Sequence, residues 1–473
     1  MEARVIRPSL LWAPRAWLPD GWRDHVLLRI GADGHWAEVS AGVHQAPAEA
    51  TVLQGAVLPG LVNAHSHAFQ RAFAGLAERR DTASGEPDNF WSWRDRMYEV
   101  ARRITPEQLR AIAAHLYVEL LRGGYTQVCE FHYLQHAPDG TPHRDPLAMS
   151  WALADAAVDA GIGLTLLPVL YERAGFEQPH LRDDQRRFAT SAEQVWAMQR
   201  RLAASARPLV GAGIAIHSLR AAAPASITQL LELAGGWDGP IHIHAAEQVR
   251  EVEDCIAATG ARPLEWLARE RLLDERWQLV HATHATPDEI QAVAQSGAGV
   301  VLCPSTEANL GDGVCDLRGW LASGTSLSIG SDSHVTRAWR EELRLLEYGQ
   351  RLVQRERNVA AAPEAGQPST AERLWSVVLD GGAAAAGLHR SGLQSGARAD
   401  LLVVDGHDHA LLGVPAAQLI DALVFSSPGR PWRDVMVAGR FVVQDHRHEG
   451  AARVASTFAE AMQQLWDPSP CRA

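Results

Sequence analysis

The stretch "LPGLVNAHSH", residues 58–67, places two histidines one residue apart directly after an apolar run. A short apolar run beside proline and glycine is typical of a buried strand in a parallel sheet. In a strand, His65 and His67 point to the same side with Cα atoms about 6.6–7 Å apart, so both imidazoles can reach one metal ion at about 2.0–2.1 Å. The alternative is a pair of surface or hydrogen-bonded core histidines, because a chain with 21 histidines contains such spacings by chance.

Further β-rich runs follow this one, and longer helical patterns separate them. The candidate strands lie near residues 57–64, 125–132, 163–171, 210–218, 240–247, 278–283, 297–305 and 325–332. Two of the helical segments begin with clear signals, with Thr105 and Thr286 as N-caps and proline at the first helical position. Eight β/α units over roughly 330 residues predict an α/β fold, a (β/α)8 TIM barrel with insertions. A doubly wound open sheet is the alternative.

Both ends of the chain are strand-like and fall outside these repeating units. Residues 1–56 contain "HVLLRI" and "HWAEVS", and the C-terminal part contains "ADLLVVDG" and "DVMVAGRFVVQD". Runs rich in β-branched and alternating apolar residues favour strands. We expect residues 1–56 and 393–473 to pair into one small β-sandwich domain, and residues 57–392 to form the barrel.

Composition and charge exclude several classes of protein. The chain has 473 residues and a net charge of −12, which argues against nucleic acid as a partner. No apolar stretch approaches the roughly 20 residues of a membrane span, and the first residues lack signal-peptide features, so we expect a cytoplasmic protein without a membrane partner. The five cysteines show no CxxC spacing, which favours small buried side chains over disulfides or a thiolate zinc site. They are Cys129, Cys255, Cys303, Cys315 and Cys471.

The chain contains no lysine, since all 44 basic residues are arginine. This absence excludes Schiff-base chemistry, a P-loop lysine and a lysine that bridges two metal ions. The chemistry therefore depends on His, Asp, Glu and Arg, and an anion site must be a local cationic pocket in an acidic protein.

Titratable residues also follow several other predicted strands. They are His217 and Arg220 after the fourth strand, His242, His244 and Glu247 at the fifth, His281 and His284 at the sixth, and Asp332 and His334 at the eighth. In a (β/α)8 barrel the carboxyl ends of all strands meet at one mouth, where active sites are built. The sequence therefore predicts one site at that mouth, although His242 lies deeper in its strand and is read as a packed histidine, and His284 and His334 lie beyond their strand ends and are read as supporting or loop residues.

Four segments, "LPGLVNAHSH", "HIHAAEQ", "LVHATH" and "GSDSH", resemble the metal-binding motifs of the amidohydrolase superfamily. "GARADLLVVDG" near the C-terminus resembles the return of that superfamily to its β-sandwich. The resemblance implies that His65, His67, His244 and Asp332 are metal ligands, that His281 and Asp332 are catalytic groups beside the metal, and that Glu247 is a proton shuttle. Many members hold two metals bridged by a carboxylated lysine, and the missing lysine favours a mononuclear site here.

A site of three histidines and one aspartate with an open position suits one Zn²⁺ per subunit, although other divalent metals are possible. Zinc lowers the pKa of bound water to about 7 and so supplies hydroxide at neutral pH. Asp332 and His281 are then placed to take the proton of the water, and Glu247 can donate a proton to the departing nitrogen. The predicted reaction is hydrolytic removal of ammonia from a C=N centre.

The predicted substrate is a small dianion derived from an amino acid. Arg220 and His217 lie after the fourth strand, and a guanidinium there suits bidentate capture of a carboxylate. Gln70, Arg94 and Tyr133 lie in the loops after the first two strands. The segments "FWSWRDRMY", "EFHYLQH" and "IHSLRA" resemble those superfamily deaminases that act on a linear amidine carrying two carboxylates. The alternative for Arg94 is a surface arginine stacked on its tryptophans.

Two other functions remain open on the sequence. A guanine, cytosine or triazine deaminase would use the same metal site with an apolar stacking pocket in place of the arginines. A non-catalytic zinc protein would normally lack Glu247, His281 or Asp332, and the chain has all three. The resemblance to the amidohydrolase superfamily further implies a homodimer.

Overall fold

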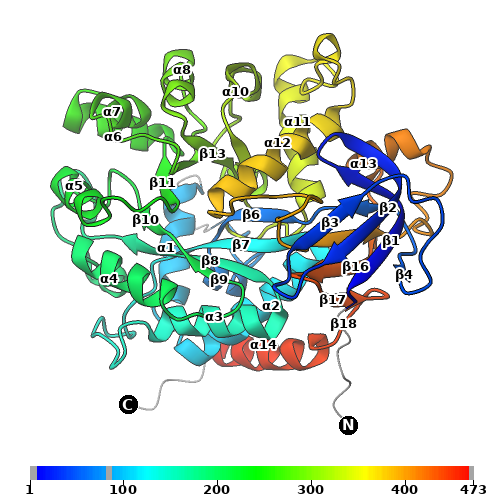
Figure 1. Cartoon of the computed structure of the whole chain (residues 1–473). Helices are drawn as coiled ribbons and strands as arrows, with labels where there is room; N and C mark the ends of the chain where they lie inside the picture. The colour runs from blue at the N-terminus through cyan, green and yellow to red at the C-terminus, as the bar shows by residue number, and fades with distance from the viewer. Residues whose placement is uncertain (1–7, 81–87, 468–473) are drawn as a thin grey trace.

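Eight parallel strands form the wall of a barrel in this computed structural model, which describes residues 8–80 and 88–467 (Figure 1). The barrel strands, in order of pairing, are β6 (Leu61–Ser66), β7 (Tyr125–His132), β8 (Gly163–Leu170), β10 (Ile214–Ile216), β11 (Ile241–Ala245), β12 (Trp277–His281), β13 (Gly299–Leu302) and β14 (Leu327–Ile329). A parallel bridge between Ser66 and Asp332 joins the last strand to the first. The predicted TIM barrel is confirmed, and the open sheet is not found.

Helices follow the strands along the chain and surround the barrel. They are α1 (Phe90–Ala101), α2 (Pro106–Gly123), α3 (Ala148–Ala160), α4 (Ala192–Ala203), α5 (Pro224–Leu233), α6 (Val249–Thr259), α7 (Pro263–Arg269), α8 (Pro287–Ser296), α9 (Pro304–Leu310), α10 (Leu317–Ser323), α11 (Trp339–Gln354), α12 (Thr370–Ala385), α13 (Leu419–Phe425) and α14 (Ala451–Trp466). Both predicted N-caps are present, since the hydroxyls of Thr105 and Thr286 each accept a backbone N–H at 3.3 Å. These caps satisfy amides that the first helical turn leaves free.

Two predicted strands are interrupted in the structure. The first divides into β5 (Val57–Leu58), which pairs in another sheet, and β6 in the barrel. Pro59 lies between them and cannot donate to a ladder, so the chain changes sheets there. The fourth divides at Gly213 into β9 (Val210–Ala212) and β10, and only β10 pairs with β11.

Segments from both ends of the chain form the second sheet. Its strands, in order, are β18 (Arg447–His448), β17 (Arg440–Gln444), β16 (Trp432–Val437), β15 (Leu401–Val404), β5, β1 (Leu10–Leu18), β2 (Gly21–Ile30) and β3 (Trp36–Ser40), with β4 (Thr51–Val52) beside β1. The backbone N–H of Trp36 donates to the Ala397 carbonyl at 2.8 Å, so the segment that starts β3 also meets the chain before β15. Leu28, Leu401 and Met436 contribute to a separate core under this sheet. A terminal β-sheet unit beside the barrel is thus confirmed.

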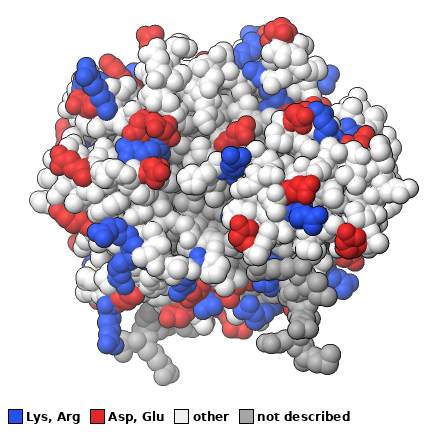
Figure 2. Space-filling view, in the orientation of Figure 1, with Lys and Arg blue, Asp and Glu red and all other residues white. Residues whose placement is uncertain are grey.

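The outside of the molecule carries the last helix of the chain and a mixture of charged side chains. Helix α14 packs against α2, and the Trp466 indole donates to the Ala72 carbonyl at 3.1 Å. The face in Figure 2 intersperses arginines with carboxylates. None of the helices within residues 8–80 and 88–467 is long and apolar enough to cross a membrane.

The cysteines behave as small buried side chains, as predicted from their spacing. The four that the structure describes are free thiols in the interior, and Cys471 lies outside the described residues. They are Cys129, Cys255, Cys303 and Cys315.

Candidate active site

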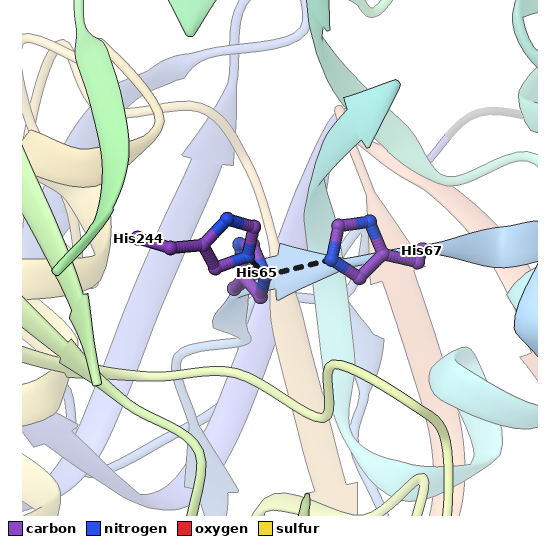
Figure 3. Close-up of side chains that lie close together, drawn as sticks. All are labelled: His65, His67 and His244. Carbon is purple, nitrogen blue, oxygen red and sulfur yellow. Dashed lines mark hydrogen bonds between the residues drawn. The ribbon is translucent and has the colours of Figure 1, made fainter. Parts of the chain in front are cut away.

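Three histidines from two strands converge at the carboxyl end of the barrel. His65 and His67 lie at the end of β6 and His244 lies in β11. The Nε2 atom of His65 is 3.1 Å from Nε2 of His67 and 3.1 Å from Nε2 of His244. Figure 3 shows the His67 and His244 rings approaching His65 from opposite sides. Nitrogens that bind one zinc ion at about 2.0–2.1 Å lie roughly 3–3.4 Å apart, so this spacing fits a common metal.

The hydrogen bonds of the His67 and His244 rings leave their converging nitrogens free to bind a metal. Nδ1 of His67 donates to the Phe131 carbonyl at 2.9 Å, and Nδ1 of His244 donates to the His217 carbonyl at 2.8 Å. A carbonyl only accepts, so each Nδ1 carries the proton and each Nε2 keeps its lone pair. Burial also lowers the pKa of all three rings, that of His65 to about 3, which keeps them neutral.

Asp332 completes the set of donors from the seam that closes the barrel. Its Oδ1 lies 3.5 Å from Nε2 of His65 and 3.4 Å from Nε2 of His67. Burial would raise the pKa of this carboxyl, but the hydrogen bond from His65 and the nearby histidines hold it below its usual range. The backbone N–H of Asp332 donates to the His65 carbonyl at 3.0 Å, and its carbonyl accepts from the His67 N–H at 3.2 Å. Three neutral imidazoles and one carboxylate are a donor set that fits zinc.

His281 lies beside these donors and contacts three carboxylates. Its Nε2 is 3.6 Å from Oε1 of Glu247 and 3.7 Å from Oδ2 of Asp332, and its Nδ1 is 3.3 Å from Oε1 of Glu307. Burial lowers the pKa of His281, but these carboxylates outweigh burial and raise it to about 10. A dication among the histidines would oppose that rise because it repels an imidazolium. His281 and Asp332 both have positive φ, +73° and +44°, a strained backbone that is common at functional sites.

Glu247 lies where it can exchange protons near neutral pH. Burial raises the pKa of its carboxyl to about 7, with His281 opposing that rise. The backbone N–H groups of Ala246 and Glu247 donate to the Glu251 carboxylate at 3.3 and 2.9 Å and hold the segment that carries Glu247. A group that must both give and take a proton works best with a pKa near the working pH.

The residues expected to bind substrate line the same cavity. It is bordered by Gln70, Arg94, Tyr133, His217 and Arg220 together with His67, His244, Glu247, His281 and Asp332. His65 lies fully buried beneath them. The structure therefore brings every predicted site residue together at the mouth of the barrel.

The polar groups of this cavity are only partly satisfied by the protein. The Gln70 amide lies 3.3 Å from the Tyr133 hydroxyl, while Gln70 Oε1 and the Nε atoms of Arg94 and Arg220 have no hydrogen-bond partner among the described residues. Arg94 stacks on Trp91, with its guanidinium carbon 4.6 Å from the ring centroid. It is nevertheless 9% exposed and borders the cavity, so it is not a surface arginine.

Sequence reasoning missed two residues of this site, Glu307 and Glu251. Glu307 lies on α9, which follows the seventh barrel strand, β13, where no site residue was predicted. Its carboxylate is hydrogen-bonded to Nδ1 of His281. The segment "CPSTEANLGDG" resembles the same deaminases as the other loops, but no residue of it was predicted to belong to the site. Glu251 lies four residues after Glu247 on α6, where it looks like an ordinary helical carboxylate.

A parallel barrel whose first, fifth and eighth strands end in side chains that could hold a metal ion is typical of a class of metal-dependent hydrolases. The sequence model of the amidohydrolase family matches residues 56–442, and the chain belongs to this family. It is 48% identical over 464 residues to formimidoylglutamate deiminase of Pseudomonas aeruginosa. The matched region covers 97% of this chain and 100% of that protein.

Two crystal structures are close in fold. An amidohydrolase from Brucella melitensis has a TM-score of 0.90 and 41% identity, with 96% of this chain and 99% of that chain covered. An adenosine deaminase from Xanthomonas campestris with bound zinc has a TM-score of 0.78 and 23% identity, with 96% and 98% covered. The second similarity concerns the fold alone.

Proposed function

We propose that this protein is a formimidoylglutamate deiminase, which hydrolyses N-formimino-L-glutamate to N-formyl-L-glutamate and ammonia in histidine degradation. The observation that carries the proposal is the pair of partly unpartnered guanidiniums, Arg94 and Arg220, in the cavity that also holds the metal-binding donors. The 48% identity to a formimidoylglutamate deiminase along nearly the whole chain supports the same substrate.

The metal of the proposed enzyme is one zinc ion per subunit, with other divalent metals as substitutes. Its ligands would be Nε2 of His65, His67 and His244 and the Asp332 carboxylate. Zinc at such a site lowers the pKa of water to about 7 and thereby supplies a nucleophile at neutral pH. Three neutral imidazoles and one carboxylate form a donor set that suits zinc, so zinc is the first metal to test.

The chain's own groups move the protons of the reaction. Asp332 accepts the proton of the attacking water as its oxygen bonds to the formimino carbon and the C=N bond becomes single, and His281, 3.7 Å from Asp332, holds that water by a hydrogen bond. Glu247, 3.6 Å from His281, delivers a proton to the nitrogen. The proton held by Asp332 then passes to the same nitrogen and Glu247 takes the proton of the new hydroxyl, so the C–N bond breaks, ammonia leaves, and the carbon keeps the oxygen as the formyl group.

Arginines hold the glutamate part of the substrate in this proposal. Arg94 and Arg220 pair with its two carboxylates, because a guanidinium offers two parallel donors to a carboxylate. Gln70, Tyr133 and His217 orient the chain between the carboxylates and the amidine. Burial and the nearby arginines hold the pKa of His217 well below its usual value, so it acts as a neutral hydrogen-bonding group.

Other functions fit the cavity less well. A guanine, cytosine, adenosine or triazine deaminase would share the metal donors, but burying two arginines against a neutral ring would leave their charges unpaired. A protein that only stores or senses zinc would not need Glu247 and His281 beside the donors. A homodimer and a cytoplasmic location stay predictions.

A shortened substrate tests the proposal directly. N-formiminoglycine keeps the amidine and one carboxylate but lacks the second carboxylate of N-formimino-L-glutamate. We expect its kcat/KM to be at least about 100-fold lower, because one charge-assisted pair with a buried arginine is lost. Equal kcat/KM values for the two compounds would contradict a dianion pocket.

A further inference from the structure

A second cavity lies outside the candidate active site and joins it through two arginines. Its volume is about 370 Å³, and the charged side chains around it are Arg94, Arg182, Arg220, Arg250, Glu177 and Asp254. Arg94 and Arg220 border both this outer cavity and the inner one. Arg182 is paired with Asp184 at 2.7 Å, so Arg94, Arg220 and Arg250 remain against Glu177 and Asp254 and make the outer cavity positive in a protein whose net charge is −12.

Trp91 lies at the centre of this arginine cluster. The guanidinium carbons of Arg94, Arg220 and Arg250 lie 4.6, 5.3 and 5.1 Å from the centroid of its ring. The three arginines come from different places, namely α1, the segment after β10, and α6. The negative face of an indole ring attracts cations and so offsets part of the repulsion among them.

Little carboxylate charge compensates the cluster. Arg220 has no carboxylate within ion-pair distance among the described residues, Arg94 meets only the exposed Asp95 at 3.4 Å, and Arg250 meets Asp254 at 3.8 Å. The side chain of Arg250 is 66% exposed, whereas Arg94 is 9% exposed, so the cluster extends from solvent to the inner cavity. An anion with two carboxylates would pair with the guanidiniums that the protein's own carboxylates leave largely unpaired.

We propose that Trp91 is a positioning residue that holds Arg94, Arg220 and Arg250 as one cationic cluster, through which a dianionic substrate enters and is oriented. The inference rests on the proposed function and extends it to two residues of the outer cavity. Arg250 contacts the incoming anion first because it lies outermost. Arg220 and Arg94 then take over the carboxylates at the inner cavity, while Trp91 itself stays outside the chemistry.

Substitutions of Trp91 test the positioning role. Trp91→Leu should raise KM for N-formimino-L-glutamate about tenfold or more while kcat and zinc content stay unchanged, and Trp91→Phe should restore most of the loss. Trp151→Leu is the matched control, since Trp151 stacks on Arg207 at 4.8 Å away from both cavities. An unchanged KM in Trp91→Leu, or an equal rise in Trp151→Leu, would overturn the proposal.

Arg250 offers a test that cannot disturb the core. Attraction between the cluster and a dianion weakens as salt rises, so kcat/KM of the wild type should fall with ionic strength. Arg250→Gln should lower kcat/KM at low salt and flatten this dependence, whereas Arg269→Gln, on the exposed face of α7, should leave both unchanged. The same salt dependence in Arg250→Gln and wild type would contradict a role for the outer cavity.

Binding of glutarate separates this inference from the proposed function. Glutarate has two carboxylates and no amidine, so calorimetry of its binding does not depend on turnover, and butyrate serves as the monoanion for comparison. We expect glutarate to bind more tightly than butyrate, Trp91→Leu to remove most of that preference, and Arg250→Gln to weaken it. If the protein fails to hydrolyse N-formimino-L-glutamate but shows this pattern, the cluster stands and the proposed reaction falls. If it hydrolyses that substrate and the variants bind glutarate normally, the cluster is wrong and the reaction stands.

Discussion

Glu247 is the residue on which the proposed proton transfer to the leaving nitrogen depends. Glu247→Gln removes the exchangeable proton but keeps a side chain of similar size, and no metal-binding atom is lost. We expect kcat to fall about 10²–10⁴-fold while zinc content, measured by elemental analysis, stays at the wild-type level. Glu253→Gln, an exposed position on α6, the helix that follows Glu247, is the control. Wild-type turnover in Glu247→Gln would refute the proton-shuttle role.

Arg220 is the residue that most directly tests the dianion pocket. Arg220→Met keeps most of the apolar stem of the side chain but removes the guanidinium that faces the inner cavity. KM for N-formimino-L-glutamate should rise and kcat/KM should fall by about 100-fold, because a bidentate charge-assisted pair is lost. Steady-state kinetics of this variant test the prediction. Arg453 is an exposed arginine on α14, so Arg453→Met is the control and should keep wild-type constants. Kinetic constants unchanged from wild type would remove Arg220 from the site.

At the scale of single elements, α11 is anchored by a buried carboxyl whose protonation should be visible in stability. Glu342 accepts hydrogen bonds from the Ser305 N–H and hydroxyl at 2.9 and 2.6 Å and from the Thr336 hydroxyl at 2.6 Å. Burial raises its pKa from 4.5 to about 7. Between these two values the folded protein holds more protons here than the unfolded chain, so this group lowers stability as pH rises through that window.

Glu342→Gln removes this titration and should flatten the pH dependence of stability. We expect the melting temperature of the wild type to fall more than that of the variant as pH rises from 4.5 to 7. Differential scanning calorimetry across that range measures the difference, with the neighbouring Glu341→Gln as control. Parallel curves for wild type and Glu342→Gln would show that this carboxyl does not titrate in the window.

The elements also show what could be predicted from the sequence. The N-caps at Thr105 and Thr286 and the spacing of His65 and His67 are local signals, so the sequence predicts them well. Proline at position 59 could have indicated where β5 ends and β6 begins. The contact of Glu307 with His281 depends on how α9 is placed after β13, and nothing in the local sequence specifies that placement.

Over the whole molecule, three of the proposed metal ligands lie where the first and last strands of the barrel meet. His65 lies in β6, His67 directly follows it, and Asp332 follows β14 on the other side of the seam. That closure brings together residues that are far apart in the chain, so the distances between these side chains could not be predicted from the sequence. The division into a barrel of residues 57–392 and a terminal domain stays a prediction.

Removing the metal should therefore lower the stability of the entire barrel. A ligand that binds only the folded state at 1,000 times its Kd stabilises it by about 4 kcal/mol, so chelator treatment should lower the melting temperature and added zinc should restore it. Asp332→Asn, which weakens one ligand, should respond much less to the chelator. A melting temperature that chelation leaves unchanged in the wild type would argue against a bound metal.

The most direct measurement is ammonia release by the zinc-loaded protein, with N-formimino-L-glutamate compared with guanine, cytosine and adenosine. Strong release from N-formimino-L-glutamate alone is the predicted result, because only that substrate has an amidine for the metal site and two carboxylates for Arg94 and Arg220. Release from a nucleobase or nucleoside instead would keep the metal-dependent chemistry and contradict the dianion pocket.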